Sequence, residues 1–148
     1  MEEAFAALEQ AYADYHRELE ECEKNARPTD GILGVGRSEK DDPCHKHADE
    51  KIRRTVEELC AAQPTPGAAE EMARLLLLRR DTQEWPPAAQ WMLRAMERHA
   101  LPLIPLLSRE AAAEINRAYT ARYRRWERLP VQKQICKALK ARCTGETE

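Results

Sequence analysis

The densest group of chemically reactive side chains lies in residues 41–50, which read Asp-Asp-Pro-Cys-His-Lys-His-Ala-Asp-Glu. Asp42 and Pro43 are typical of a helix start, because aspartate caps free backbone amides and proline suits the first helical position. Cys44 is then the second residue of that helix, where unpaired amides and the helix dipole stabilise a thiolate. The segment therefore suits a redox-sensitive or nucleophilic cysteine.

The same segment is also suited to binding a metal ion. The candidate ligands are Cys44, His47, His45, Cys22 and His16. Cys44 and His47 are three residues apart, so they share one face of a helix, and thiolate and imidazole groups are the usual ligands of zinc. Zinc is thus the alternative cofactor. In the simpler interpretation, the segment is a polar helix start and the protein has no cofactor.

A second distinctive stretch, residues 109–128, combines arginine with aromatic side chains on what we expect to be one helix. The candidate contacts to nucleic acid are Arg117, Arg124, Arg125 and Arg128, beside a stripe of Tyr119, Tyr123 and Trp126. Arginines bind phosphates, and aromatic rings stack on bases, so nucleic-acid binding is an alternative function. The competing interpretation places the aromatic rings in the core and the arginines in water or on acidic partners.

The composition indicates that these side chains stand on helices. The chain has 148 residues, of which 75 are Ala, Leu, Glu or Arg, whereas Val and Ile together number only 8. The four abundant types are strong helix formers, and β-sheets require β-branched residues. We therefore predict an all-α fold.

The clearest helix is the first one, over residues 2–25. Its apolar positions step by three and four residues, namely Phe5, Leu8, Tyr12, Tyr15, Leu19 and Cys22. This spacing is typical of a long amphipathic helix that packs in a bundle.

Proline and capping residues divide the rest of the chain into five more helices. We expect them over residues 43–63, 66–82, 87–100, 109–129 and 131–142. Residues 102–105 form a short apolar connector in this scheme. The prediction is one compact domain over residues 1–143, with a Gly-rich loop at 26–43 and a disordered tail at 144–148.

The distribution of charge and cysteine excludes several classes of protein. Residues 1–71 carry 18 acidic and 9 basic side chains, whereas 109–143 carry 10 basic and 3 acidic ones. This asymmetry suits either a nucleic-acid surface or two halves that neutralise each other. The longest apolar run, residues 100–107, is too short to span a bilayer. Five cysteines without a CxxC motif, and an acidic N-terminus, indicate a cytoplasmic protein with reduced thiols and no membrane partner.

No motif for an enzyme is present in the sequence, which contains neither GxSxG nor a Walker sequence. Regular apolar stripes and a segregated charge distribution are typical of proteins that associate with other proteins. We therefore expect a non-enzymatic helical bundle that acts by protein–protein association, as an adaptor, a regulator or a self-associating module. Its partner would be another protein or a second copy of itself.

Overall fold

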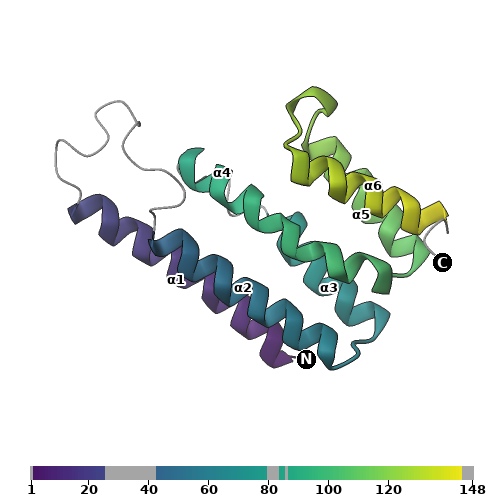
Figure 1. Ribbon diagram of the computed structural model, residues 1–148, viewed down its shortest axis with the longest axis horizontal. Coiled ribbons are helices and arrows are strands. Elements are labelled where there is room, and N and C mark those ends of the chain that lie inside the picture. The colour runs from purple at the N-terminus through teal and green to yellow at the C-terminus, as the bar shows by residue number, and fades with distance from the viewer. Residues whose placement is uncertain (1, 26–42, 80–83, 86, 145–148) are drawn as a thin grey trace. The chain divides into compact units, whose positions relative to one another are not determined.

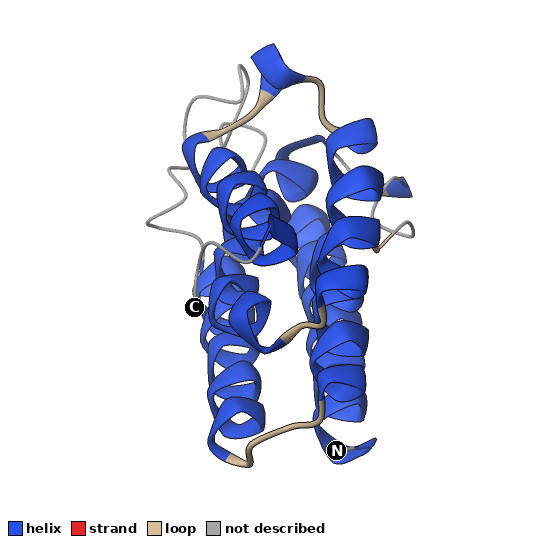
Figure 2. Cartoon of the chain, turned by 90° about the vertical axis from the view of Figure 1, so that its right-hand side faces the viewer, coloured by secondary structure: helices blue, strands red, loops and turns tan. Residues whose placement is uncertain are grey.

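The computed structural model describes residues 2–25, 43–79, 84–85 and 87–144. All of the elements in these ranges are helical (Figure 2). The α-helices are α1 (Glu2–Asn25), α2 (Pro43–Ala61), α3 (Pro66–Leu77), α4 (Pro87–Met96), α5 (Arg109–Arg122) and α6 (Pro130–Thr144). Two 3₁₀ segments complete the fold, η3 (Glu97–Leu106) and η4 (Arg125–Glu127). The predictions of an all-α fold with about six helices and of a long N-terminal helix are confirmed.

Two predicted boundaries fall partly outside the described residues. Of the Gly-rich segment 26–43, the structure describes only Pro43, which is the first residue of α2. Of the predicted tail 144–148, it describes only Thr144, which is the last residue of α6 rather than part of a tail.

The chain divides into two units, residues 2–55 and residues 56–148. In the first unit, α1 and most of α2 run antiparallel (Figure 1). Lys51 Nζ lies 3.1 Å from Asp14 Oδ2, and His47 Nδ1 lies 3.2 Å from Glu18 Oε1, so a later residue on one helix meets an earlier residue on the other. That the two units make up one domain over residues 1–143 stays a prediction.

The apolar stripe of α1 is buried at its centre, as its spacing predicts. The buried positions described in this unit are Leu8, Ala11, Tyr12 and Tyr15 of α1 and Cys44, His45, Ala48, Ile52 and Thr55 of α2. Their spacing of three and four residues on each helix keeps them on one face, so burial of that face holds the hairpin together.

The second unit is built around η3, which contacts α3, α4 and α6, while α5 packs on α6 and α3 (Figure 1). Predicted as a connector, residues 102–105 instead belong to this ten-residue 3₁₀ helix. A 3₁₀ helix has about three residues per turn, so side chains three apart share a face. Glu97, Ala100 and Leu103 accordingly point into the core, whereas Pro102 and Pro105 are exposed.

The helices predicted over 43–63 and 87–100 end slightly early, at Ala61 and Met96, and two others end at least five residues before their expected last residue. The helix predicted over 109–129 stops at Arg122, because Tyr123 adopts extended backbone angles of φ −119° and ψ 112°. The helix predicted over 66–82 stops at Leu77, whose carbonyl oxygen accepts a hydrogen bond of 3.4 Å from Arg122 Nη1. The two C-terminal ends are therefore tied to each other.

Candidate functional site

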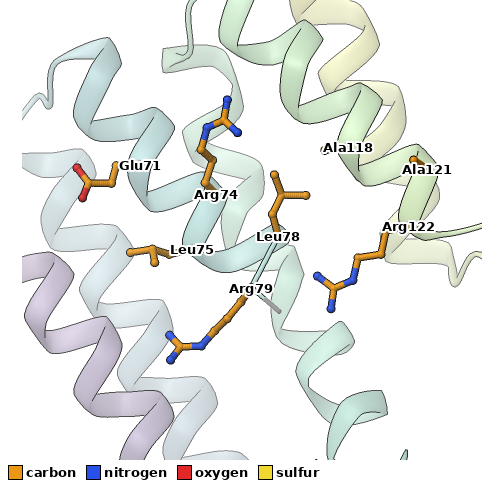
Figure 3. A pocket seen from close by; sticks show the side chains of 8 residues that line it. All are labelled: Glu71, Arg74, Leu75, Leu78, Arg79, Ala118, Ala121 and Arg122. Carbon is orange, nitrogen blue, oxygen red and sulfur yellow. The ribbon is translucent and has the colours of Figure 1, made fainter. Parts of the chain in front are cut away.

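A groove of about 730 Å³ lies between α3 and α5, within the second unit (Figure 3). Its lining residues are Glu71, Arg74, Leu75, Leu78, Arg79, Ala118, Ala121 and Arg122. On α3 with the two residues that follow it, and on α5, these positions recur at three- and four-residue intervals, which places them on facing sides. Ala118 and Ala121 are exposed, so the α5 wall is low and the groove is open to solvent.

Side-chain caps fix where both wall helices begin. Thr65 Oγ1 accepts a hydrogen bond of 3.2 Å from the Ala68 amide at the start of α3. Ser108 Oγ accepts one of 3.1 Å from the Ala111 amide at the start of α5. Both helix starts agree with the sequence prediction, and each cap satisfies an amide that the helix leaves unpaired.

An arginine bridges the two walls at each end of the groove. Arg74 of α3 is bound by Glu70 on its own helix at 3.0 Å and by Glu114 of α5 at 2.9 Å. Arg122 of α5 reaches the last carbonyl of α3, as described above. With Arg79, three guanidinium groups line the groove against one carboxylate, Glu71, so the lining is basic around an apolar floor.

Directly behind Arg122 lies a buried carboxyl, Glu97, which exposes only 6% of its surface. Tyr119 donates a hydrogen bond of 2.5 Å to Glu97 Oε2, and Tyr123 donates one of 3.0 Å to Oε1. The two tyrosine rings meet edge to face, with centroids 5.0 Å apart. We call Glu97, Tyr119 and Tyr123 the carboxyl–tyrosine cluster.

Burial raises the pKa of Glu97 to about 7, against the hydrogen bonds from Tyr119 and Tyr123 and the attraction of Arg122 and Arg94, which lower it. The pKa of Tyr119 is raised by burial and by the neighbouring carboxylate. The pKa of Tyr123 is raised to about 12, chiefly by burial. Both phenols therefore remain hydrogen-bond donors at neutral pH, while the carboxyl is poised to titrate there.

Tyr123 connects this cluster to the groove. The guanidinium carbons of Arg94 and Arg122 lie 5.3 and 5.4 Å from the centroid of its ring, which is within cation–π range. Arg122 thus lines the groove and also contacts the ring whose hydroxyl binds Glu97. The cluster itself is not part of the groove lining in the described residues.

The candidate ligands on α2 occupy different environments. Cys44 and His45 are buried in its first turn. The His47 side chain is 55% exposed and lies against Glu18 of α1. Although Cys44 and His47 are three residues apart, one is in the interior and the other is at the surface.

The candidate ligands on α1 do not complete a metal site in the described residues. His16 Nδ1 lies 3.6 Å from Glu20 Oε1 on the same helix. The side chain of Cys22 lies outside what the structure describes. Among the residues that are described, no three His, Cys, Asp or Glu side chains gather as a metal ion would require. Zinc binding stays a prediction.

The candidate nucleic-acid residues do not share a helix face. Arg117 is exposed on α5, but Arg124, Arg125 and Arg128 follow the end of that helix. Arg128 Nε donates a hydrogen bond of 3.1 Å to the Tyr123 carbonyl. Trp126, expected in the apolar stripe, is exposed instead because the chain has left the helix before reaching it.

Sequence reasoning missed the groove and Glu97. Glu97 stands three residues before Ala100 and six before Leu103, in a segment whose two prolines are also three apart. That period of three was the signal for a 3₁₀ helix with Glu97 on its buried side. The groove left no such signal, because the sequence does not show that Ala118 and Ala121 lie opposite Leu75 and Leu78.

Comparison of the chain with protein-family models, with curated protein sequences and with solved structures gives no match. None of the helices in the described ranges has both the length and the apolar character that a membrane crossing requires.

Proposed function

We propose that this protein is a non-enzymatic helical protein that binds a partner protein at the α3–α5 groove. The partner element would be an amphipathic helix with an acidic flank. The observation that carries this proposal is the apolar floor of Leu75, Leu78, Ala118 and Ala121 set among three arginines.

The spacing of the floor supports a helical occupant. Leu75 and Leu78 on one wall, and Ala118 and Ala121 on the other, are each three residues apart. Helices that bind in grooves present their anchor side chains at the same intervals of three and four. The small alanines leave the volume that such anchors would occupy.

The charge of the lining supports an acidic flank. Arginine forms strong charge-assisted hydrogen bonds to carboxylates, often through two parallel N–H groups. Arg79 and Arg122 are half-buried beside the floor, where attraction to a partner carboxylate is screened less than at a fully exposed site.

The openness of the groove argues for a protein segment over a small substrate. Sites for small ligands enclose most of the ligand surface, whereas here the α5 wall is exposed. Within the described residues, Glu97 is the carboxyl whose pKa is strongly raised, and it is not part of the groove lining. Both features favour association over catalysis.

Two designed peptides test the proposal. One helical peptide carries leucines at intervals of three and four with glutamate flanks, and the other carries lysine in place of each glutamate. Fluorescence anisotropy with the full chain should show saturable binding of the acidic peptide and none of the basic one. Ala118→Trp should weaken binding at least about tenfold by filling the groove.

The matched control is Ala7→Trp, which adds the same side chain at an exposed alanine of α1. Equal binding of both peptides, or an unchanged affinity in Ala118→Trp, would contradict the proposal. So would binding of dodecanoate without binding of the peptide, which would indicate a small-molecule site. A dimer in sedimentation that Ala118→Trp dissociates would make a second copy the occupant, and not another protein.

A further inference from the structure

The most exposed large hydrophobic side chain in the described residues is Trp126, at 78%. It lies in η4, the three-residue turn between α5 and α6. The guanidinium carbon of Arg124 lies 5.8 Å from the centroid of its ring, and Arg125 beside it is also exposed. An exposed indole among arginines is a marked exception, because soluble proteins keep tryptophan largely buried.

Helix α6, which begins three residues after η4, carries further exposed basic side chains. Lys133, Lys137 and Lys140 are exposed, and their steps of four and three residues place them on one face. The opposite face, formed by Gln132, Ile135 and Leu139, is buried. The helix contains no aspartate or glutamate at any position. The lysine row is therefore not neutralised from within its own helix.

We propose that η4 and α6 form a binding surface for single-stranded nucleic acid. Bases would stack on Trp126, and phosphates would lie along the lysine row of α6. The residues that make up this surface are Arg124, Arg125, Trp126, Lys133, Lys137 and Lys140. The inference is independent of the groove and of the protein partner proposed there.

The residue types favour single-stranded nucleic acid over other polyanions. An aromatic ring that projects beside a basic track is the arrangement by which proteins bind single strands without reading their sequence. An acidic protein segment would use the lysines but would have no need of the indole. A membrane surface would need an exposed apolar face on the helix, and the apolar face of α6 is buried in the fold.

This surface also replaces the one expected from sequence. The predicted interface lay on one helix over residues 109–128, with Arg117, Arg124 and Arg128 on one face and Arg125 beside it. The structure ends that helix at Arg122 and exposes Trp126 beside Arg124 and Arg125, so the proposed surface includes the indole and adds the lysines of α6.

Anisotropy of a fluorescein-labelled oligo(dT) of 20 nucleotides, titrated with the full chain at low salt, tests the inference. We expect saturable binding whose affinity falls steeply with salt. Trp126→Ala should weaken it roughly tenfold or more, while Trp126→Phe should keep most of it. Changing Lys133, Lys137 and Lys140 to Gln should lower the affinity and reduce the salt slope by about 2.

The matched control removes three exposed positive charges from the other unit, by Arg17→Gln, Lys46→Gln and Arg54→Gln. It should leave oligo(dT) binding within about twofold of the unchanged chain, since these charges lie outside the surface. Quenching of tryptophan fluorescence by the oligonucleotide gives a second readout, and Trp126→Phe should remove it.

Four outcomes would overturn the inference. The first is no binding of oligo(dT) at low salt. The second is equal weakening by the control triple, which would indicate attraction without a defined surface. The third is an affinity unaffected by Trp126→Ala, with poly-glutamate bound equally well. The fourth is tighter binding to phosphatidylserine vesicles than to the oligonucleotide, which would indicate a membrane surface.

Discussion

The Tyr119 hydroxyl lies 2.5 Å from Glu97 Oε2 and ties α5 to η3 inside the core. The other carboxyl oxygen is held by Tyr123 at 3.0 Å. Without these donors a buried carboxylate would be strongly unfavourable, because burial removes its hydration. The groups that face it are Arg94 of α4, Arg122 of α5 and, on α6, Cys136, whose own pKa is raised chiefly by burial.

The stability of the protein should fall as the pH rises through the range in which Glu97 titrates. Its pKa is about 7 in the folded chain, against 4.5 as the ordinary value. Between these pH values the folded state holds a proton that the unfolded state has lost, so raising the pH favours unfolding. The loss in the free energy of unfolding approaches about 3 kcal/mol above pH 7. Urea denaturation at pH 5 and pH 8 measures it.

Glu97→Gln supplies the control for this effect, because the amide is neutral at every pH. The free energy of unfolding of the variant should change little between pH 5 and pH 8. Asp14 and Glu50 do not interfere, since hydrogen bonds from Gln10 and Arg53, respectively, lower their pKa values and confine their influence to acid pH. If the stability of the variant fell as steeply with rising pH as that of the unchanged chain, another group would be responsible.

Removing either tyrosine hydroxyl should raise the pKa of Glu97 further. Tyr119→Phe and Tyr123→Phe each delete a hydrogen bond that favours the ionised carboxyl. Each substitution should lower the free energy of unfolding by about 2 kcal/mol at pH 8, and by less at pH 5, where the carboxyl is neutral. Carbon-13 NMR titration of the glutamate carboxyls reports the pKa directly. A lowered pKa, or a larger cost at pH 5, would refute this account.

The helix caps that position the groove should each contribute measurably to stability. Thr65→Ala and Ser108→Ala remove the oxygen that accepts the Ala68 or Ala111 amide, at a cost of about 1 kcal/mol each. Thr120→Ala is the matched control. Its hydroxyl bonds the Asn116 carbonyl within α5, an interaction that adds little to a helix. Equal effects in all three variants would speak against a capping role.

The metal hypothesis has its own test in the chain purified without a histidine tag. Since Cys44 is buried and His47 is exposed, we expect no stoichiometric zinc. Elemental analysis of this chain and of Cys44→Ser decides the question. One zinc per chain that is lost in the variant would contradict the expectation and would restore the segment around Cys44 as the functional region.

Helix starts were predictable because their signals are local. Thr65-Pro66 and Ser108 fix their helices through bonds within three residues, so these caps need no partner from a distant part of the chain. The long first helix was predictable from its apolar period. Such features need no knowledge of the rest of the fold.

Helix ends and the candidate sites depend instead on distant groups. Helix α5 ends where the Tyr123 hydroxyl meets Glu97, 26 residues earlier in the chain. The groove exists because Ala118 happens to face Leu75, which sequence periodicity cannot show. Glutamate usually faces solvent, and the burial of Glu97 depends on two tyrosine donors that lie 22 and 26 residues away in the sequence.

The exposed prolines of η3 have a consequence for how the core is assembled. A 3₁₀ helix turns about 120° per residue, so the six steps from Glu97 to Leu103 complete whole revolutions. An α-helix turns about 100° per residue and would leave the two side chains about 120° apart. In an α-helix, the rings of Pro102 and Pro105 would clash with the carbonyls four residues earlier. The prolines thus disfavour the α-helical alternative, and the 3₁₀ geometry points the acid and the leucine in the same direction.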